Sequence, residues 1–300
     1  MSAPAGAAAA ELLVAGLAYF EVHVPAGAPP QPGEERFVST IGLGFGGALN
    51  SASVAAALGL RVALCVPAGA GVADHALALL ARRLGIALTA LPCGDNPAIS
   101  LVYASADERA FLSAADFTAL ERVETLPAAR WIHVPGLEEA ARLAAPLARA
   151  RGAGAQVAVS GSWTPARLAA LAARRDCPWD LLVLNDKEAH AACGDVAEAP
   201  RHLAGAARSV LVTQGAQGAF GTLNGYGVRL PAAALAVCDP TGAGDAFCAG
   251  LLAALIRGAA PEPALRLAGA AAGHILQQRG GVLDDPARIA LVAKEMRWIS

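Results

Sequence analysis

Short apolar runs alternate with longer stretches of helical spacing along most of the chain. The apolar runs predict buried strands at residues 11–18, 61–67, 87–92, 131–136, 156–161, 180–185 and 209–215. The stretches between them predict helices at residues 48–60, 72–86, 138–152, 165–175 and 186–194, and another helix is predicted to begin near residue 242. Strands separated by helices of roughly ten to fifteen residues indicate an α/β fold with a mostly parallel central sheet and helices on both faces.

Two β-like stretches interrupt this alternation. Residues 19–45 are polar and irregular apart from a short strand predicted at 36–41, and residues 98–113 have the pattern of a hairpin that turns at 106–108. We expect the two stretches to pair as a small lid on one edge of the main domain. The predicted organisation is therefore a disordered tail at residues 1–10 and a single α/β domain at residues 11–300 that carries this lid.

Composition excludes several classes of partner. The chain has 300 residues, of which 55% are hydrophobic and 16% charged, and its formal net charge is −2. This charge favours neither nucleic acid nor an anionic membrane as a partner. No apolar run approaches the roughly 18 residues that cross a bilayer, and no basic residues precede the N-terminal apolar stretch, as a secretory signal would require. The six scattered cysteines lack a C-x-x-C pair, which indicates reduced thiols and a cytoplasmic location.

A first glycine cluster, IGLGFGGALNSA at residues 41–52, contains the dinucleotide-binding pattern G-x-G-x-x-G. That interpretation needs an acidic residue about 20 residues further on, where the chain instead has CVPAGAG, and the nearest acid is Asp74. Asn50 follows the pair Gly46–Gly47 and lies in the first turn of the predicted helix. Exposed backbone amides beside a carboxamide make a good surface for hydroxyl groups, so we interpret this cluster as a binding surface for an alcohol.

A second glycine cluster, CDPTGAGDAF at residues 238–247, precedes the last predicted helix. Gly242, Ala243 and Gly244 would present free N–H groups at its N-terminus, which is a favourable site for an anion. Asp245 alone could merely complement the helix dipole. Beside an anion site, however, its carboxylate suits a general base that takes the proton of a hydroxyl attacking a phosphoryl group. No Walker A sequence occurs, which excludes an enzyme of the P-loop type.

Further short motifs lie between and beside the two clusters. LNDKEA at 184–189 contains Asn-x-x-Glu, VTQGAQG at 212–218 contains Thr-x-Gly, and DERAFL at 107–112 falls in the predicted lid. With GGALNSASVAAALG at 46–59 and DPTGAGDAF at 239–247, these motifs resemble the signatures of the ribokinase (PfkB) family of carbohydrate and nucleoside kinases. They occur in family order and span roughly residues 11–283.

The resemblance implies a ribokinase-like fold and ATP-dependent phosphorylation of a hydroxyl on a small sugar or sugar-like acceptor, with Mg²⁺ and, in some members, K⁺. It implies Asp245 as general base and the amides of Gly242, Ala243 and Gly244 as an anion hole. The ATP-binding residues that it implies are Asn185, Thr213, Gly215, Gly218, Thr241, Gly269 and Gly273, and the acceptor-binding residues are Glu21, Gly46, Gly47, Asn50 and Arg109. Glu188 would hold Mg²⁺ through water, and Asp239 would help to hold a monovalent cation.

One of these roles also has support from the chain itself. Asn185 and Glu188 follow a buried strand, where ligands collect in open α/β sheets, and oxygen ligands suit Mg²⁺. The alternative is that Glu188 is an ordinary acid early in a helix.

The sequence also departs from the family pattern near the acceptor. Members usually carry an aspartate five residues after a glycine of the first strand, whereas counting from Gly16 gives Glu21, whose extra methylene moves the carboxylate by about 1.5 Å. Phe45 stands where a glycine is frequent and would narrow the pocket or stack on an acceptor. Arg36 and Arg109 lie on the predicted lid and could face an acceptor phosphate. These departures leave the acceptor open.

Two alternatives to a sugar kinase remain at this stage. A nucleoside kinase on the same scaffold is favoured by Phe45, and a non-catalytic ligand-binding relative is kept open by Glu21. The absence of a G-x-S-x-G elbow disfavours an α/β-hydrolase, and the absence of His/Cys ligand spacing disfavours a zinc enzyme. Lid strands with one exposed face often pair between copies, so we also expect a homodimer through the lid.

Overall fold

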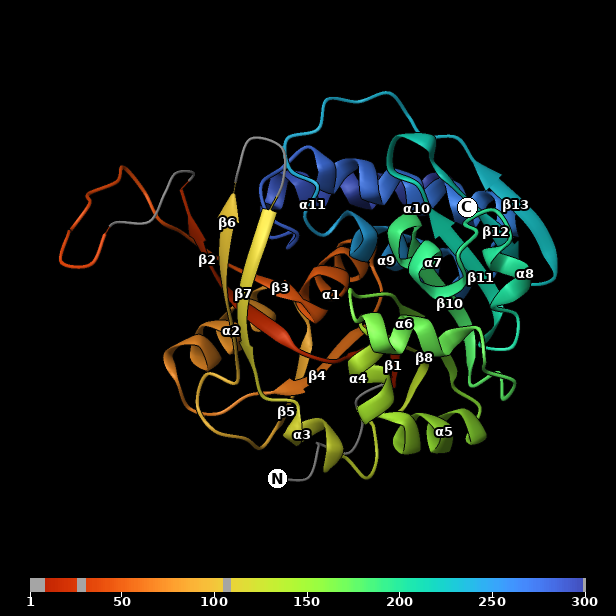
Figure 1. Cartoon of the computed structure of the whole chain (residues 1–300), viewed down its shortest axis with the longest axis horizontal. Helices are drawn as coiled ribbons and strands as arrows, with labels where there is room; N and C mark the ends of the chain where they lie inside the picture. The colour runs from red at the N-terminus through yellow and green to blue at the C-terminus, as the bar shows by residue number, and fades with distance from the viewer. Residues whose placement is uncertain (1–8, 26–30, 105–108, 299–300) are drawn as a thin grey trace.

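The larger of two sheets forms the centre of the computed structural model, which describes residues 9–25, 31–104 and 109–298 (Figure 1). Within these residues it has nine strands, in the spatial order β13 (Tyr226–Leu230), β12 (Ala219–Leu223), β11 (Ala207–Thr213), β10 (Trp179–Asn185), β9 (Gln156–Ser160), β8 (Ala129–Val134), β1 (Ala10–Ala15), β4 (Val62–Pro67) and β5 (Ala87–Leu91). In this spatial order, all strands between β11 and β5 run parallel to one another, with both end strands included. Strands β12 and β13 add an antiparallel edge.

Both faces of this sheet are covered, as the continuous apolar runs predict. In β1, Leu12 and Val14 belong to one buried apolar cluster, and Leu13 and Ala15 belong to another on the opposite face. One face is covered by α1 (Ala48–Ala57), α2 (Val72–Arg83), α9 (Ala243–Ile256), α10 (Pro261–Leu276) and α11 (Pro286–Ala293). The other is covered by α3 (Thr118–Glu121), α4 (Leu137–Arg142), α5 (Ala144–Gly152), α6 (Pro165–Leu171), α7 (Asp186–Cys193) and α8 (Ala199–His202). The predicted fold class is thus confirmed.

A small sheet lies beside the large one, to the left in Figure 1. Its order is β3 (Gly42–Gly47), β2 (Ala18–Val24), β6 (Ala98–Ala104) and β7 (Arg109–Ala115). Strand β2 follows directly on β1, so the chain passes from the large sheet into the small one across Gly16 and Leu17. The predicted hairpin turn at 106–108, most of the predicted tail at 1–10 and the side chain of Arg109 lie outside the described residues.

Several boundaries differ from the prediction. The strand predicted at 11–18 is two strands, β1 and β2, because one apolar run continues through the step between the sheets. The strand predicted at 36–41 is wrong, since the structure has no strand there and forms β3 from the glycine-rich residues that follow. The helix predicted at 138–152 is interrupted at Leu143 because Pro146 has no N–H to donate to the carbonyl four residues earlier.

Two further differences concern lengths and missed elements. Helix α6 ends at Leu171, before the predicted end at residue 175. Strand β12 was not expected, and it forms the antiparallel edge together with β13. No helix in the described part of the chain is long and apolar enough to span a membrane.

Candidate active site

The first turns of two helices, α1 and α9, meet at the centre of the site. Helix α1 begins after Gly47, which has a φ of 65° and no space for a side chain because a Cβ there would overlap the carbonyl of Leu17. The Ala48 N–H donates to that same carbonyl over 2.8 Å. This tight entry places Asn50 in the first turn of α1, where its side-chain Nδ2 donates to Oδ2 of Asp245 over 2.9 Å.

Helix α9 begins in a similar way. Its N-cap, Gly242, is left-handed with a φ of 77°, and a Cβ at this position would overlap the Cα of Gly281. Only glycine meets both requirements without strain. The backbone thus turns so that the first amides of α9 and the carboxylate of Asp245 lie together at the positive end of the helix. The Ala243 N–H also makes a long hydrogen bond of 3.3 Å to the carbonyl of Pro240.

The pKa of the Asp245 carboxyl lies well above the ordinary value for an aspartate. Burial raises its pKa to about 6, and hydrogen bonds from Asn50 and Ser51 oppose that rise. The nearby negative charges of Glu21 and Glu188 raise the pKa further. The hydroxyl of Ser51, which the sequence analysis did not single out, lies 3.5 Å from Asp245 Oδ1. A carboxyl with a pKa near 6 is mostly ionised at pH 7 and is a stronger base than an ordinary aspartate.

Two buried oxygen atoms near Asp245 have no hydrogen-bond partner among the described residues. They are Oε2 of Glu21 and Oδ1 of Asn50. Glu21 is only 5% exposed, and its Oε2 lies 3.2 Å from His23 Nε2 without the geometry of a hydrogen bond. A buried acceptor without a partner is costly, so both atoms are prepared to accept a hydrogen bond from a ligand.

One cavity of about 1520 Å³ joins these groups. Of the predicted site residues, it is lined by Glu21, Gly47, Asn50, Asp239, Thr241, Gly242 and Asp245. Its apolar wall includes Phe20 and Phe45, whose rings meet edge to face with centroids 5.4 Å apart. Phe45, which departs from the family pattern, is therefore a wall of the cavity. Arg36 is exposed and does not line it.

The loop before α9 is tied to a second glycine loop that the sequence analysis missed. Asp239 is buried, and its carboxylate accepts hydrogen bonds from the N–H of Thr241 over 2.8 Å and from the N–H of Gly280 over 2.7 Å. The next residue, Gly281, lies so close to Asn50 that a Cβ would be 2.6 Å from its carboxamide. The adjacent glycines 280 and 281 were the available signal in the sequence.

Asn185 and Glu188 lie at the carboxyl end of β10 and cap α7 reciprocally. The side chain of Asn185 accepts from the Glu188 N–H over 2.8 Å, and the side chain of Glu188 accepts from the Asn185 N–H over 2.9 Å. Glu188 is buried, and burial raises its pKa. A Cβ at Gly161 would overlap its carboxylate, so this glycine makes room for it. Neither Asn185 nor Glu188 lines the cavity.

The remaining predicted nucleotide residues gather at the antiparallel edge of the large sheet. Gly218 has a φ of 91° and no room for a Cβ beside the carbonyl of Leu230, while a Cβ on Gly269 would be 2.6 Å from the Leu230 side chain. Gly273 faces Leu235, and Thr213 Oγ1 lies 3.4 Å from the carbonyl of Leu184. Gly215 begins the 3₁₀ turn η1 (Gly215–Gln217). The described structure shows no group of three or more His, Cys, Asp or Glu residues that could hold a metal ion.

Comparison with known proteins assigns this arrangement to a family. The family model described as pfkB family carbohydrate kinase matches residues 11–288. A segment of 73 residues is 45% identical to the bifunctional protein HldE of Caulobacter sp. (strain K31), and one of 84 residues is 42% identical to a fructokinase of Klebsiella pneumoniae. These segments cover 24% and 28% of this chain, but only 15% and 26% of the two relatives.

Solved structures match over nearly the whole chain. A probable sugar kinase from Rhizobium etli CFN 42 has a TM-score of 0.78 at 19% identity, covering 97% of this chain and 99% of that one. The Arabidopsis thaliana ribokinase complexed with ribose and ATP has a TM-score of 0.76 at 21% identity, with the same coverage of 97% and 99%. A Burkholderia thailandensis nucleoside kinase in complex with inosine has a TM-score of 0.74 at 21% identity, covering 95% and 97%. These similarities show that the fold is ribokinase-like.

Proposed function

The chain belongs to the pfkB family of carbohydrate kinases, which makes it a phosphotransferase with an alcohol group as acceptor, and we propose that it phosphorylates a small sugar or sugar-like molecule with ATP. The γ-phosphoryl group would pass to a hydroxyl of the acceptor at Asp245. The observation that carries this proposal is the 2.9 Å hydrogen bond from Asn50 to Asp245, because it joins the acceptor-type motif to the anion-type motif in one cavity.

Asp245 acts as the general base in this proposal. As the acceptor oxygen attacks the γ-phosphorus, its proton passes to the Asp245 carboxylate, and the bond between the γ-phosphorus and the bridging oxygen breaks to release ADP. Amides of Gly242, Ala243 and Gly244 stabilise the negative charge of the transferring oxygens, aided by the helix dipole. Asn50 holds the carboxylate in position while leaving its own Oδ1 to the acceptor.

The donor set suits Mg²⁺ held mainly by phosphates and water. Mg²⁺ commonly keeps several waters and uses one or two carboxylates, and Glu188 supplies one buried carboxylate whose Oε2 is already anchored to the Asn185 N–H. When bound, Mg²⁺ would neutralise charge on the phosphates. Glu188 would orient the coordinated water, and Asn185 would contact the nucleotide phosphates. Both carboxylate oxygens of Asp239 accept backbone N–H groups, so a K⁺ ion there would share oxygens that already fix the loop.

The nucleotide would bind along the edge formed by Thr213, Gly215 and Gly218, with Thr241 near its phosphates. Gly269 and Gly273 of α10 would close the base site around the segment at 230–235, against which they already pack. The opposite half of the cavity would receive the acceptor.

The acceptor would be recognised by hydrogen bonds to its hydroxyl groups. Glu21 and Asn50 each present a buried oxygen without a hydrogen-bond partner among the described residues, and the missing side chain of Gly46 makes room for the Glu21 carboxylate. The small sheet would close over the acceptor as a lid and exclude water, which would otherwise be phosphorylated. Arg109, which begins β7 of this lid, stays a proposed acceptor-binding residue.

A nucleoside is the second candidate acceptor. The edge-to-face pair of Phe20 and Phe45 lines the cavity and offers an aromatic surface for a base. The hydrogen bond between Asn50 and Asp245 and the glycine turn before α9 favour a catalytic protein over a non-catalytic relative in this proposal.

We also propose a homodimer that forms through the small sheet. Leu43 and Leu112 lie in one row across this sheet and are 68% and 63% exposed, which is unusual for large apolar residues and provides a surface for a second copy. The six free cysteines and the use of ATP agree with a cytoplasmic location.

The test is ADP release with Mg-ATP across a panel of free sugars, sugar phosphates and nucleosides, with Asp245→Asn assayed beside the wild type. We expect release that depends on one acceptor class and falls by about 10²–10⁴-fold in the variant. A variant that binds ATP normally and turns over as fast as the wild type would exclude Asp245 as the base. Failure of the wild-type protein to bind ATP would refute the proposed function.

A further inference from the structure

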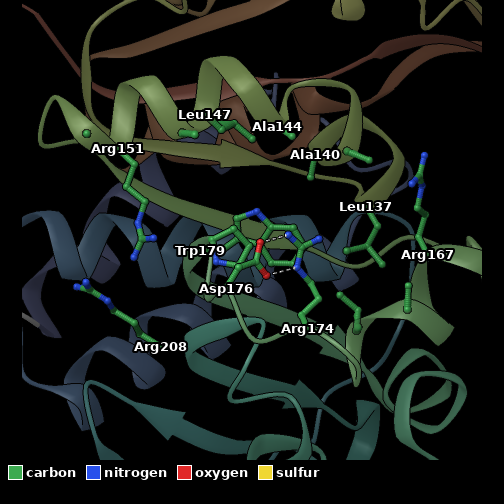
Figure 2. A pocket seen from close by; sticks show the side chains of 16 residues that line it. Leu137, Ala140, Ala144, Leu147, Arg151, Arg167, Arg174, Asp176, Trp179 and Arg208 are labelled. Carbon is green, nitrogen blue, oxygen red and sulfur yellow. Dashed lines mark hydrogen bonds and ion pairs between the residues drawn. The ribbon is translucent and has the colours of Figure 1, made fainter.

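A second cavity, of about 610 Å³, lies among α4, α5, α6 and the start of β10 (Figure 2). It shares no lining residue with the cavity that contains Asp245. Its volume falls within the roughly 300–1,000 Å³ of typical small-molecule sites. Trp179 lines it at the start of β10, about 20 Å of strand away from Asn185 at the other end.

The inner surface of this cavity is apolar. Buried Leu137, Leu147 and Leu171 form its floor together with Trp179, and the small side chains of α4 and α5 leave the space open. In Figure 2, Ala140 and Ala144 border the same space as Leu147. A ring-sized apolar body would remove its surface from water here, which favours binding.

Four arginines line the same cavity, namely Arg151, Arg167, Arg174 and Arg208. The charge of Arg174 is already paired, since its guanidinium donates to both carboxylate oxygens of Asp176 at 3.0 and 2.7 Å. The same guanidinium lies over the Trp179 ring. This stacked pair makes one flat wall of the cavity, as Figure 2 shows.

The other three arginines that line the cavity share their partner carboxylates with one another or with a further arginine. Asp180 is buried and serves both Arg151, at 3.0 and 3.1 Å, and Arg208, at 3.5 Å. Glu138 likewise serves Arg167 and also Arg142, which has Glu121 as a second partner. The four lining arginines thus have three partner carboxylates, which leaves an excess of one positive charge in a chain whose net charge is −2.

Arg208 carries this excess. Its side chain is 71% exposed, and its contact with Asp180 is the longest in the group. Figure 2 places its guanidinium beside that of Arg151, on one side of Trp179. A single anionic group at this point would be held by charge-assisted hydrogen bonds while its apolar body lies against the floor.

We propose that this cavity is a second ligand site, separate from the active site, for a small molecule with a ring-sized apolar body and one anionic group such as a carboxylate, a sulfonate or a phosphate. The charge excess, the flat Trp179–Arg174 wall and the apolar floor together select this chemistry. A neutral apolar molecule would leave the Arg208 charge without an anionic partner in the ligand. A small inorganic anion would leave the apolar floor in contact with water.

The probe for the test is 8-anilinonaphthalene-1-sulfonate, which has two aromatic parts and one sulfonate and fluoresces in apolar surroundings. We expect saturable binding to one such site in the presence of saturating ATP. Filling the cavity with Ala148→Phe, at an exposed position, should weaken that binding at least tenfold. Arg208→Gln should weaken it by about five- to tenfold, because one charge-assisted hydrogen bond is lost.

Two controls distinguish binding in the cavity from nonspecific binding of the probe and test the contribution of its charge. Arg201→Gln changes an exposed arginine that pairs with Glu198 and does not line the cavity, and should bind the probe as the wild type does. The uncharged N-phenyl-1-naphthylamine should bind at least tenfold more weakly. If Ala148→Phe does not fold, as judged by circular dichroism, Ala144→Phe replaces it.

Three outcomes would overturn the proposal. The first is unchanged probe binding in Ala148→Phe and Arg208→Gln, and the second is equal affinity for the uncharged probe. The third is an assembly that dissociates when Ala148→Phe is introduced, measured by light scattering, because the cavity would then be an interface between copies.

Discussion

The Glu21 carboxylate on β2 lies directly against the Cα of Gly46 on β3, so that a Cβ on Gly46 would overlap Oε1 of Glu21. The Glu21 carboxylate therefore requires glycine at position 46 of β3. The same packing buries Glu21 and leaves its Oε2 without a hydrogen-bond partner in the described structure. The acceptor site and the glycine-rich strand thus depend on each other.

Gly46→Ala should displace the Glu21 carboxylate and raise the KM for the acceptor by about tenfold or more, with a smaller effect on the KM for ATP. The measurement is steady-state kinetics with each substrate varied in turn. Gly44→Ala is the matched control on the same strand, because its Cβ would lie an ordinary 3.6 Å from His23 Nε2. Equal effects of the two substitutions would show that Gly46 does not act through Glu21.

A second pair of glycine variants tests the anion hole. Gly242→Ala combines a left-handed backbone with an overlap at Gly281, so it should lower the melting temperature and reduce kcat by about a hundredfold or more. Gly244→Ala keeps its amide and has open space around the new methyl group, so it should retain kcat within a few-fold. The measurements are the melting temperature and kcat of each variant. A large loss of kcat in Gly244→Ala would mean that its missing side chain, and not its amide, matters.

The central fold was predictable because the chemistry of its strands is local. Most of the parallel strands are short apolar runs, and α9 follows a glycine turn that only a few residues define. The two clusters containing Asn50 and Asp245 could also be assigned to one site by family resemblance, although the two residues are 195 positions apart in the sequence. The strand at 36–41 was predicted wrongly because β-propensity carries no information about the pairing partner. Strand β2 pairs with the glycine-rich residues 42–47 instead.

Other parts of the site had no local signal. The contact of Gly281 with Asn50, and the hydrogen bonds from the N–H groups of Thr241 and Gly280 to Asp239, depend on how two loops meet the first turn of α1. The second cavity is likewise absent from any motif, since its arginines come from α5, α6, the segment after α6 and β11. Periodicity identifies helices, but it does not show which arginines share a carboxylate.

Glu188→Gln separates the two roles open to Glu188. Glutamine can keep the reciprocal cap with Asn185, so the melting temperature should change little. The loss of charge should raise the Mg²⁺ concentration for half-maximal activity by about tenfold, because a carboxylate orients coordinated water better than an amide. Activity is measured as a function of Mg²⁺ at saturating ATP. An unchanged Mg²⁺ dependence with a lowered melting temperature would make Glu188 a capping residue alone.

Asp245→Asn should be more stable than the wild type above pH 6. Folding raises the pKa of Asp245 from 3.8 to about 6, so the folded protein favours the protonated carboxyl. The stabilisation from this preference is fully present below pH 3.8, is lost as the pH rises to about 6, and stays lost above it. Asparagine does not ionise, and its advantage in melting temperature should therefore appear between these pH values and persist to pH 8. A melting-temperature difference that does not vary with pH would contradict the raised pKa.

The wild-type rate should follow the ionisation of the same carboxyl. Since the unprotonated form of Asp245 accepts the proton of the acceptor, kcat/KM for the acceptor should rise with pH, with a midpoint near 6. Removing a neighbouring negative charge with Glu21→Gln or Glu188→Gln should move this midpoint to lower pH, because both charges raise the Asp245 pKa. Glu198→Gln removes an exposed charge on the surface and serves as the control. The three variants have the same change of residue type, so a midpoint that moves equally in all of them, or moves upward, would place the titrating group elsewhere than Asp245.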